Sequence, residues 1–123
     1  MMSEETKRVV EGYFAAWTSN KPKEARAFLA DDLEFIGPSA HYKSADEFYP
    51  GLVGFSAMTK GARVRELIVD GERAALLYDC ELPPPVGTIR IASFFRVVNG
   101  KIKTYDTQFD ATEFRKLIAQ KGG

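Results

Sequence analysis

The 123-residue chain carries 17 basic and 17 acidic side chains, so it lacks the basic excess that is typical of nucleic-acid-binding proteins. Apolar residues make up 45% and charged residues 28% of the sequence, a globular composition that suits one domain over residues 1–123. Because Cys80 is the only cysteine, an internal disulfide and a zinc site built on several thiolates are both excluded.

The sequence carries no sign of export or of membrane insertion. Residues 1–8 are polar and mixed in charge, without the apolar stretch that follows the basic start of a signal peptide. No run of about 18 apolar residues, the length needed to cross a bilayer, occurs in the chain. We therefore expect a cytoplasmic protein with no membrane partner and no nucleic-acid partner.

The first predicted element is an amphipathic helix. Ser3, followed by Glu4 and Glu5, is typical of a helix start, because the positive end of the helix dipole favours acidic side chains. Beyond it the apolar residues recur at helical spacing: Val9, Val10, Tyr13, Phe14 and Trp17. This stripe predicts one buried helix face, on which Tyr13 and Trp17 lie one turn apart.

A second, shorter helix and a short strand are predicted next. Pro22 suits the first turn of a helix, where a missing N–H costs least. This helix buries Ala25, Phe28 and Leu29 and ends at Asp31 and Asp32. Residues 33–36 then form a short strand, which Gly37 and Pro38 end.

A third helix is predicted from Ser44. Ser44 and Glu47 have the spacing of a capping box, and the helix that follows turns Phe48 inward. The rest of this segment contains Pro50, Gly51 and Gly54, so we expect it to be irregular.

From residue 62 onward the pattern changes to strands joined by hairpins. Asp70-Gly71 joins strands at 64–69 and 73–82, and Asn99-Gly100 joins strands at 88–98 and 102–109. Three consecutive prolines at 83–85 separate the two hairpins, because proline cannot donate to a strand ladder.

The chain ends in a predicted helix. Asp110, with Glu113 three residues later, is a start signal, and the helix runs through Ile118. The grouped strands and the helices around them predict an α+β fold, in which one curled antiparallel sheet is wrapped by the N-terminal helices and encloses a cavity.

Four segments together resemble the nuclear-transport-factor-2-like (NTF2-like) superfamily, including its SnoaL-like and ketosteroid-isomerase-like branches. They are VVEGYFAAW (9–17), FLADDLEFIGP (28–38), VDGERAALLYD (69–79) and FFRVVNGKIKTYDTQFD (94–110). The resemblance covers nearly the whole chain and implies a cone-shaped, cystatin-like sheet around one pocket. It implies no single activity, because the superfamily hosts isomerases, cyclases, epoxide hydrolases and non-enzymes on one scaffold.

The resemblance carries over only part of any known catalytic set. Compared with ketosteroid isomerase, Tyr13 matches the hydrogen-bonding tyrosine, but the base position falls at Gly37 and the second acid at Ser93. The inward acids of the limonene-epoxide-hydrolase pattern are replaced by Ser93 and Thr107. A cyclase needs an acid in the pocket, and only Asp79 is placed to supply one.

Strand alternation predicts which side chains face the cavity. If Phe109 faces inward, as the resemblance implies, then Tyr105, Thr107, Ile91, Ser93 and Phe95 do so too. On residues 73–82 one register turns Leu77, Asp79 and Glu81 inward, and the other turns Leu76, Tyr78 and Cys80 inward; the alignment favours the first. The predicted ligand-binding residues are Trp17, Leu77, Ile91, Ser93, Phe95, Tyr105, Thr107 and Phe109.

Three residues are candidates for acid–base chemistry on a small hydrophobic molecule without a cofactor. Tyr13 donates a hydrogen bond to the ligand, and Asp79 or His41 moves a proton. If Asp79 is buried, desolvation raises its pKa and makes it a candidate acid or base. His41 is the only histidine in the chain. Cys80 has no basic neighbour that would activate it, and no metal-ligand cluster or phosphate loop is present.

A second hypothesis is a non-catalytic ligand-binding or interaction module that forms a homodimer. Phe94 and Val98 alternate with the cavity-facing residues, so they project from the outer face of the sheet, where exposed apolar side chains usually mark an interface. The position of Asp79 separates the two hypotheses, because a carboxylate in the pocket favours chemistry and one on the surface favours binding alone.

Overall fold

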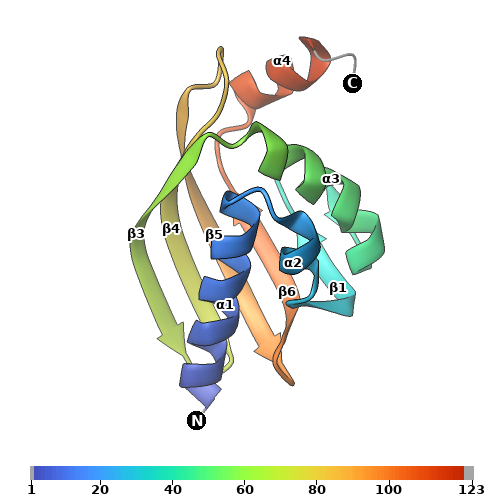
Figure 1. The fold of residues 1–123 in the computed structure, drawn as a ribbon, viewed down its shortest axis with the longest axis vertical. Coiled ribbons are helices and arrows are strands. Elements are labelled where there is room, and N and C mark those ends of the chain that lie inside the picture. The colour runs from blue at the N-terminus through green and yellow to red at the C-terminus, as the bar shows by residue number, and fades with distance from the viewer. Residues whose placement is uncertain (1, 121–123) are drawn as a thin grey trace.

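Residues 2–120, which the computed structural model describes, are built around one six-stranded sheet with the order β2-β1-β6-β5-β4-β3 (Figure 1). Neighbouring strands are antiparallel except β1 and β6, which run parallel. The strands are β1 (Leu29–Ile36), β2 (His41–Tyr42), β3 (Gly61–Asp70), β4 (Arg73–Glu81), β5 (Thr88–Val98) and β6 (Lys101–Gln108). The sheet curves without closing, and the predicted α+β class is confirmed.

Four helices accompany the sheet within these described residues. They are α1 (Met2–Thr18), α2 (Pro22–Arg26), α3 (Ala45–Met58) and α4 (Thr112–Gln120). Helices α1 and α3 lie over the same, concave face of the sheet, and α4 lies beyond one end of it (Figure 1). The stripe predicted for the first helix is confirmed, since Val9, Val10 and Tyr13 are fully buried.

Both predicted hairpins form, because their glycines adopt backbone angles that other residues rarely tolerate. Asn99 and Gly100 have φ values of 53° and 75°, which are the positive angles of a two-residue strand connection. Gly71 has a φ of 61° and lies between Asp70 and Arg73, which are paired across β3 and β4. These turns set the register of β3 with β4 and of β5 with β6.

The predicted end of the second helix is wrong. Strand β1 begins at Leu29, so Asp31 and Asp32 lie inside a strand and do not terminate a helix. The parallel neighbour β6 explains this, because Leu29 pairs with Ile102 and the amide of Ile102 donates to the carbonyl of Phe28 (2.8 Å). The two acids project to solvent while Leu29 is buried.

The expected irregular segment after Phe48 is also wrong, because α3 continues through Pro50 to Met58. Proline in a helix interior removes one backbone hydrogen bond, here to the carbonyl of Asp46. Phe48, Leu52 and Ser56 follow at four-residue spacing and are all buried, and this packing outweighs the local penalty. The predicted start is confirmed, since the Ser44 hydroxyl accepts from the amide of Glu47 (3.1 Å).

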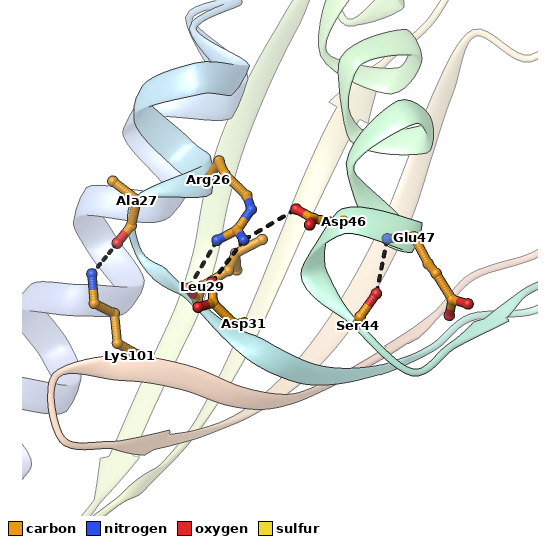
Figure 2. Close-up of polar contacts among 8 residues, drawn as sticks. All are labelled: Arg26, Ala27, Leu29, Asp31, Ser44, Asp46, Glu47 and Lys101. Carbon is orange, nitrogen blue, oxygen red and sulfur yellow. Dashed lines mark hydrogen bonds and ion pairs between the residues drawn. The ribbon is translucent and has the colours of Figure 1, made fainter.

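A set of polar contacts ties α2, β1, α3 and β6 together near one end of the sheet (Figure 2). Arg26 donates to the carbonyl of Leu29 (3.2 Å) and to the carboxylates of Asp31 (2.9 Å) and Asp46 (3.3 Å). The ammonium group of Lys101, at the start of β6, donates to the carbonyl of Ala27 (2.5 Å). These contacts fix the first turn of α3 against the start of β1.

No helix within residues 2–120 combines the length and the apolar character that crossing a bilayer requires.

Candidate functional site

A cavity of about 470 Å³ lies between the concave face of the sheet and the helices. Its walls come from α1, α3 and α4, from strands β1, β2, β4, β5 and β6, and from the 37–40 segment between β1 and β2. Nearly half of the lining residues are aromatic: Tyr13, Trp17, Phe35, Tyr42, Phe48, Phe55, Tyr78, Tyr105, Phe109 and Phe114. None of the described lining residues is an Asp, Glu, Lys, Arg or His.

Strand pairing determines which side chains reach this cavity. Tyr78 of β4 lies directly opposite Ile91 of β5, and both line the cavity. On β6 the alternate residues Tyr105 and Thr107 face the same way. Directly paired residues share a face of the sheet, so these side chains form the wall of the cavity opposite α1 and α3.

Tyr13 is the most unusual polar group of the site. It is fully buried, it lines the cavity, and its hydroxyl oxygen has no hydrogen-bond partner in the described protein. Its ring packs edge-on against Tyr105, with the ring centres 5.4 Å apart. Burial raises the pKa of Tyr13 well above its ordinary value, and the charge and hydrogen-bonding capacity of the neighbouring Tyr105 raise it further, so the hydroxyl stays protonated.

A second polar feature is a pair of hydroxyls on adjacent strands. The oxygens of Ser93 and Thr107 are 2.9 Å apart, and both residues are buried. Thr107 lines the cavity, whereas Ser93 lies behind it and contacts the lining through Thr107. Burial also raises the pKa of Tyr78 and of Tyr105, which leaves a floor of neutral hydroxyls beneath aromatic walls.

Asp79 is not in the cavity, so the strand register that the sequence favoured is wrong. The buried residues of β4 are Ala74, Leu76, Tyr78 and Cys80, while Leu77 and Asp79 face the outer side and Glu81 is exposed. The Asp79 carboxylate lies between Arg90 (Oδ1 to Nε, 2.9 Å) and Arg65 (Oδ2 to Nη2, 2.6 Å). Arg90, and then Arg65, lower the pKa of Asp79 to about 2, so this group is a permanently charged anion at neutral pH.

His41 lies beside the cavity but points away from it. Its neighbours Ala40 and Tyr42 line the cavity, whereas His41 is exposed and its Nε2 lies 3.0 Å from the Glu34 carboxylate. Alternation along the two-residue strand β2 is the reason, because consecutive side chains face opposite sides. The structure therefore places Tyr13 together with most of the predicted ligand-binding residues, whereas His41 and Asp79 lie outside the cavity.

The remaining predicted ligand residues divide into two groups. Trp17, Ile91, Tyr105, Thr107 and Phe109 line the cavity. Ser93 and Phe95 face the same side but are covered, and Phe95 stacks on Tyr105 with a centroid distance of 4.7 Å. Cys80 is buried, its thiol lies 3.6 Å from the Thr59 hydroxyl, and burial raises the pKa of the thiol, which leaves it unreactive.

The predicted ligand-binding set missed the lining residues of α3, of the 37–40 segment and of α4. Gly37, Pro38, Ser39 and Ala40 form one rim, and Phe114 and Ile118 of α4 form another. The apolar positions of α4 repeat at helical spacing and give the only signal that this helix buries a face. Metal binding finds no support here, since no three His, Cys, Asp or Glu side chains of the described chain converge.

Comparison with known proteins gives one family and several similar structures. Residues 10–105 match the family model of the SnoaL-like domain. No protein of curated function matches the chain. A protein of Kribbella flavida DSM 17836 has a similar structure, with a TM-score of 0.85 and 27% identity, covering 94% of this chain and 96% of that one.

Two further structures are similar in fold alone. An NTF2-like protein of unknown function from Cytophaga hutchinsonii ATCC 33406 has a TM-score of 0.77 at 19% identity, covering 92% of this chain and 94% of that one. An LEH-like epoxide hydrolase of M. tuberculosis has a TM-score of 0.74 at 19% identity, covering 96% of each chain.

Proposed function

Because the chain belongs to the SnoaL-like family of the NTF2-like superfamily, we propose that its cavity binds a small, neutral, largely apolar molecule through an acceptor oxygen that meets the hydroxyl of Tyr13. The observation that carries the proposal is that hydroxyl itself, a buried donor that makes no hydrogen bond of standard geometry with the described protein and belongs to a residue lining the cavity. Buried polar groups in proteins are nearly always hydrogen-bonded, so a donor left free in a pocket is an expected contact for a ligand.

The walls support the size and the neutrality of this ligand. A volume of about 470 Å³ lies within the range of small-molecule sites, and such sites are mostly apolar with a few polar groups. The described lining carries no charged side chain, so an ionised ligand would enter without a counter-charge. Aromatic rings on several sides favour a flat or ring-containing molecule.

The same lining supports binding over acid–base catalysis. A general acid or base works best when its pKa lies near the operating pH. The described walls hold hydroxyls whose pKa values are raised, and Asp79 is paired with two arginines on the other side of the sheet. At the positions where the resemblance to ketosteroid isomerase requires acids, this chain has Gly37 and Ser93.

Fluorescence titration with two neutral probes tests the proposal. Prodan carries a ketone oxygen, and N-phenylnaphthylamine is of similar apolar character without a carbonyl. We expect the protein to bind both, because both fit an aromatic cavity. The variant Tyr13→Phe should weaken prodan binding by roughly tenfold, since the ketone is then buried without a donor, and should leave N-phenylnaphthylamine binding unchanged.

The matched control is Tyr49→Phe, which removes a phenol hydroxyl from α3 outside the cavity. It should bind both probes as the original protein does. Failure of the unaltered protein to bind either probe would contradict the binding function. Equal loss of both probes in Tyr13→Phe would contradict the assigned role of the hydroxyl.

We also propose that the protein forms a homodimer through the outer face of its sheet. Ile68, Ala75 and Phe94 lie in one row across β3, β4 and β5, and Phe94 and Ile68 are 52% and 57% exposed. Leu77 and Ala92 form the next row on the same face. A second copy is the occupant favoured by charge, because the chain has a net charge of zero and two copies do not repel each other.

A further inference from the structure

Helix α4 closes one end of the cavity. Phe114 and Ile118 line it, and Leu117 of the same helix is buried. Phe114 packs against Phe55 of α3 and against Phe109, with ring centres 5.6 Å apart in both pairs. Figure 1 shows α4 beyond the end of the sheet, close to the C-terminal end of α3.

Arg115 attaches α4 to the opposite rim. Its Nε donates to the Ser39 hydroxyl (3.0 Å), and Nη2 lies 3.5 Å from the carbonyl oxygen of Pro38. Pro38 and Ser39 both line the cavity. The helix therefore spans the opening, with Phe114 against the α3 side and Arg115 against the 37–40 segment.

The attachments of α4 are few compared with those of the sheet. Asp110 accepts a hydrogen bond from the amide of Thr112 (3.1 Å) and holds the start of the helix. Lys116 pairs only within the helix, with Glu113. Segments with few buried apolar side chains and exposed polar contacts open at a lower free energy than the core of a sheet.

We propose that α4 is a gate over the cavity and that Arg115 is the positioning residue that holds the gate closed against Pro38 and Ser39. This rests on the proposed function, because a gate matters only if the cavity exchanges a ligand. Ligand enters and leaves when Arg115 releases the rim and the helix moves away from Phe55. Phe114 and Ile118 then act as the part of the ligand wall that moves.

Stopped-flow fluorescence with prodan measures the gate. Arg115→Ala removes the contact with the rim and should accelerate both association and dissociation by roughly two- to tenfold, because the open state gains population. The equilibrium dissociation constant should change little, since both rates rise together. Lys116→Ala, on the exposed side of the same helix, is the control and should leave both rates unchanged.

A double-variant test separates this contact from a general loosening of α4. Ser39→Ala removes one acceptor of Arg115 and should accelerate exchange to a smaller extent, because the carbonyl of Pro38 remains. In the combined variant Ser39→Ala with Arg115→Ala, exchange should be no faster than in Arg115→Ala alone, as expected for two partners of one interaction.

Acrylamide quenching of Trp17 tests the gate without any ligand. Trp17 is the only tryptophan, it lines the cavity, and it is 2% exposed. Arg115→Ala should raise the quenching constant, and Lys116→Ala should not. If the exchange rates and the quenching of Arg115→Ala both equal those of Lys116→Ala, the gate is overturned. If prodan does not bind but Arg115→Ala still raises quenching, the gate stands and the proposed function fails.

Discussion

Tyr13 illustrates how a binding residue differs from a packing residue. A buried hydroxyl without a partner lowers the stability of the free protein, because it gave up its water contacts and gained nothing in return. We predict that Tyr13→Phe raises the free energy of unfolding by about 1 kcal/mol. Urea denaturation of the ligand-free protein measures this, and the gain has the opposite sign to the expected loss of prodan affinity.

The control for this stability change is again Tyr49→Phe, whose half-buried ring lies outside the cavity. Its unfolding free energy should stay within about 0.5 kcal/mol of the original value. A Tyr13→Phe protein that is destabilised by more than about 1 kcal/mol would contradict the prediction, because the hydroxyl would then be hydrogen-bonded inside the folded protein.

The inward orientation of Tyr13 could be predicted from the sequence, whereas the outward orientation of His41 and Asp79 could not. Tyr13 follows from helical periodicity, which is a local property of the sequence. Chemistry alone favours His41 and Asp79 as proton carriers, but their side chains point away from the cavity because each occupies the outward position of its strand. Closeness in sequence to residues that line the cavity thus does not tell which face of its strand a titratable side chain occupies.

The alternation of uncharged and charged residues along β4 indicates which of its side chains face the cavity. The inward positions Ala74, Leu76, Tyr78, Cys80 and Leu82 are all uncharged. The outward set includes Arg73, Asp79 and Glu81. A strand buries its uncharged alternate face, so this pattern outweighs an alignment at low similarity. The length of α3 could not be predicted for a different reason. Pro50 locally disfavours the helix, and the packing of the buried residues of α3 outweighs it.

The Arg65, Asp79 and Arg90 contacts join β3, β4 and β5 across the outer face. We predict that Asp79→Asn lowers the thermal midpoint at pH 7 by roughly 1–4 °C, because two cationic partners lose their anion. The folded pKa of Asp79, about 2, lies below the unfolded value near 3.9, so its contribution is complete above that unfolded pKa. The contribution disappears as the pH falls from about 4 towards 2, and the melting curves of the two proteins should converge there.

Asp106→Asn is the matched control for the Asp79 prediction. Asp106 also belongs to the outer face, but its carboxylate accepts a hydrogen bond from the side-chain Nε2 of Gln108 (2.8 Å) and is not bound by two arginines. Its thermal midpoint at pH 7 should follow that of the original protein. A constant difference between Asp79→Asn and the original protein from pH 7 down to pH 2 would show that charge pairing is not the cause.

At the scale of the whole molecule, the cavity depends on contacts between distant parts of the chain. Hairpin turns and helix starts are local, and the sequence predicts them from a few residues. The rims of the cavity join Ser39 to Arg115 and Phe55 to Phe114, which are far apart in the sequence. No periodicity encodes such pairs, so the curved fold was predictable while the closure of its open end was not.

The apolar row on the outer face of the sheet is exposed in a single copy of the chain, with Phe94 52% and Ile68 57% exposed. Phe94 lies at one end of this row, between Ala75 on β4 and Asp106 on β6. In sedimentation velocity at micromolar concentration we expect a dimer, and Phe94→Glu should convert it to a monomer, since two like charges would meet with their hydration removed.

Val53→Glu on α3 provides the control for that experiment, because Val53 is 38% exposed but lies away from the outer face of the sheet. This variant should remain a dimer, and circular dichroism should show that both variants keep the fold. Binding of prodan should survive in the monomer, because the cavity lies on the concave side of the sheet, away from the proposed interface. An unaltered protein that sediments as a monomer at micromolar concentration would refute the dimer and leave the binding function standing.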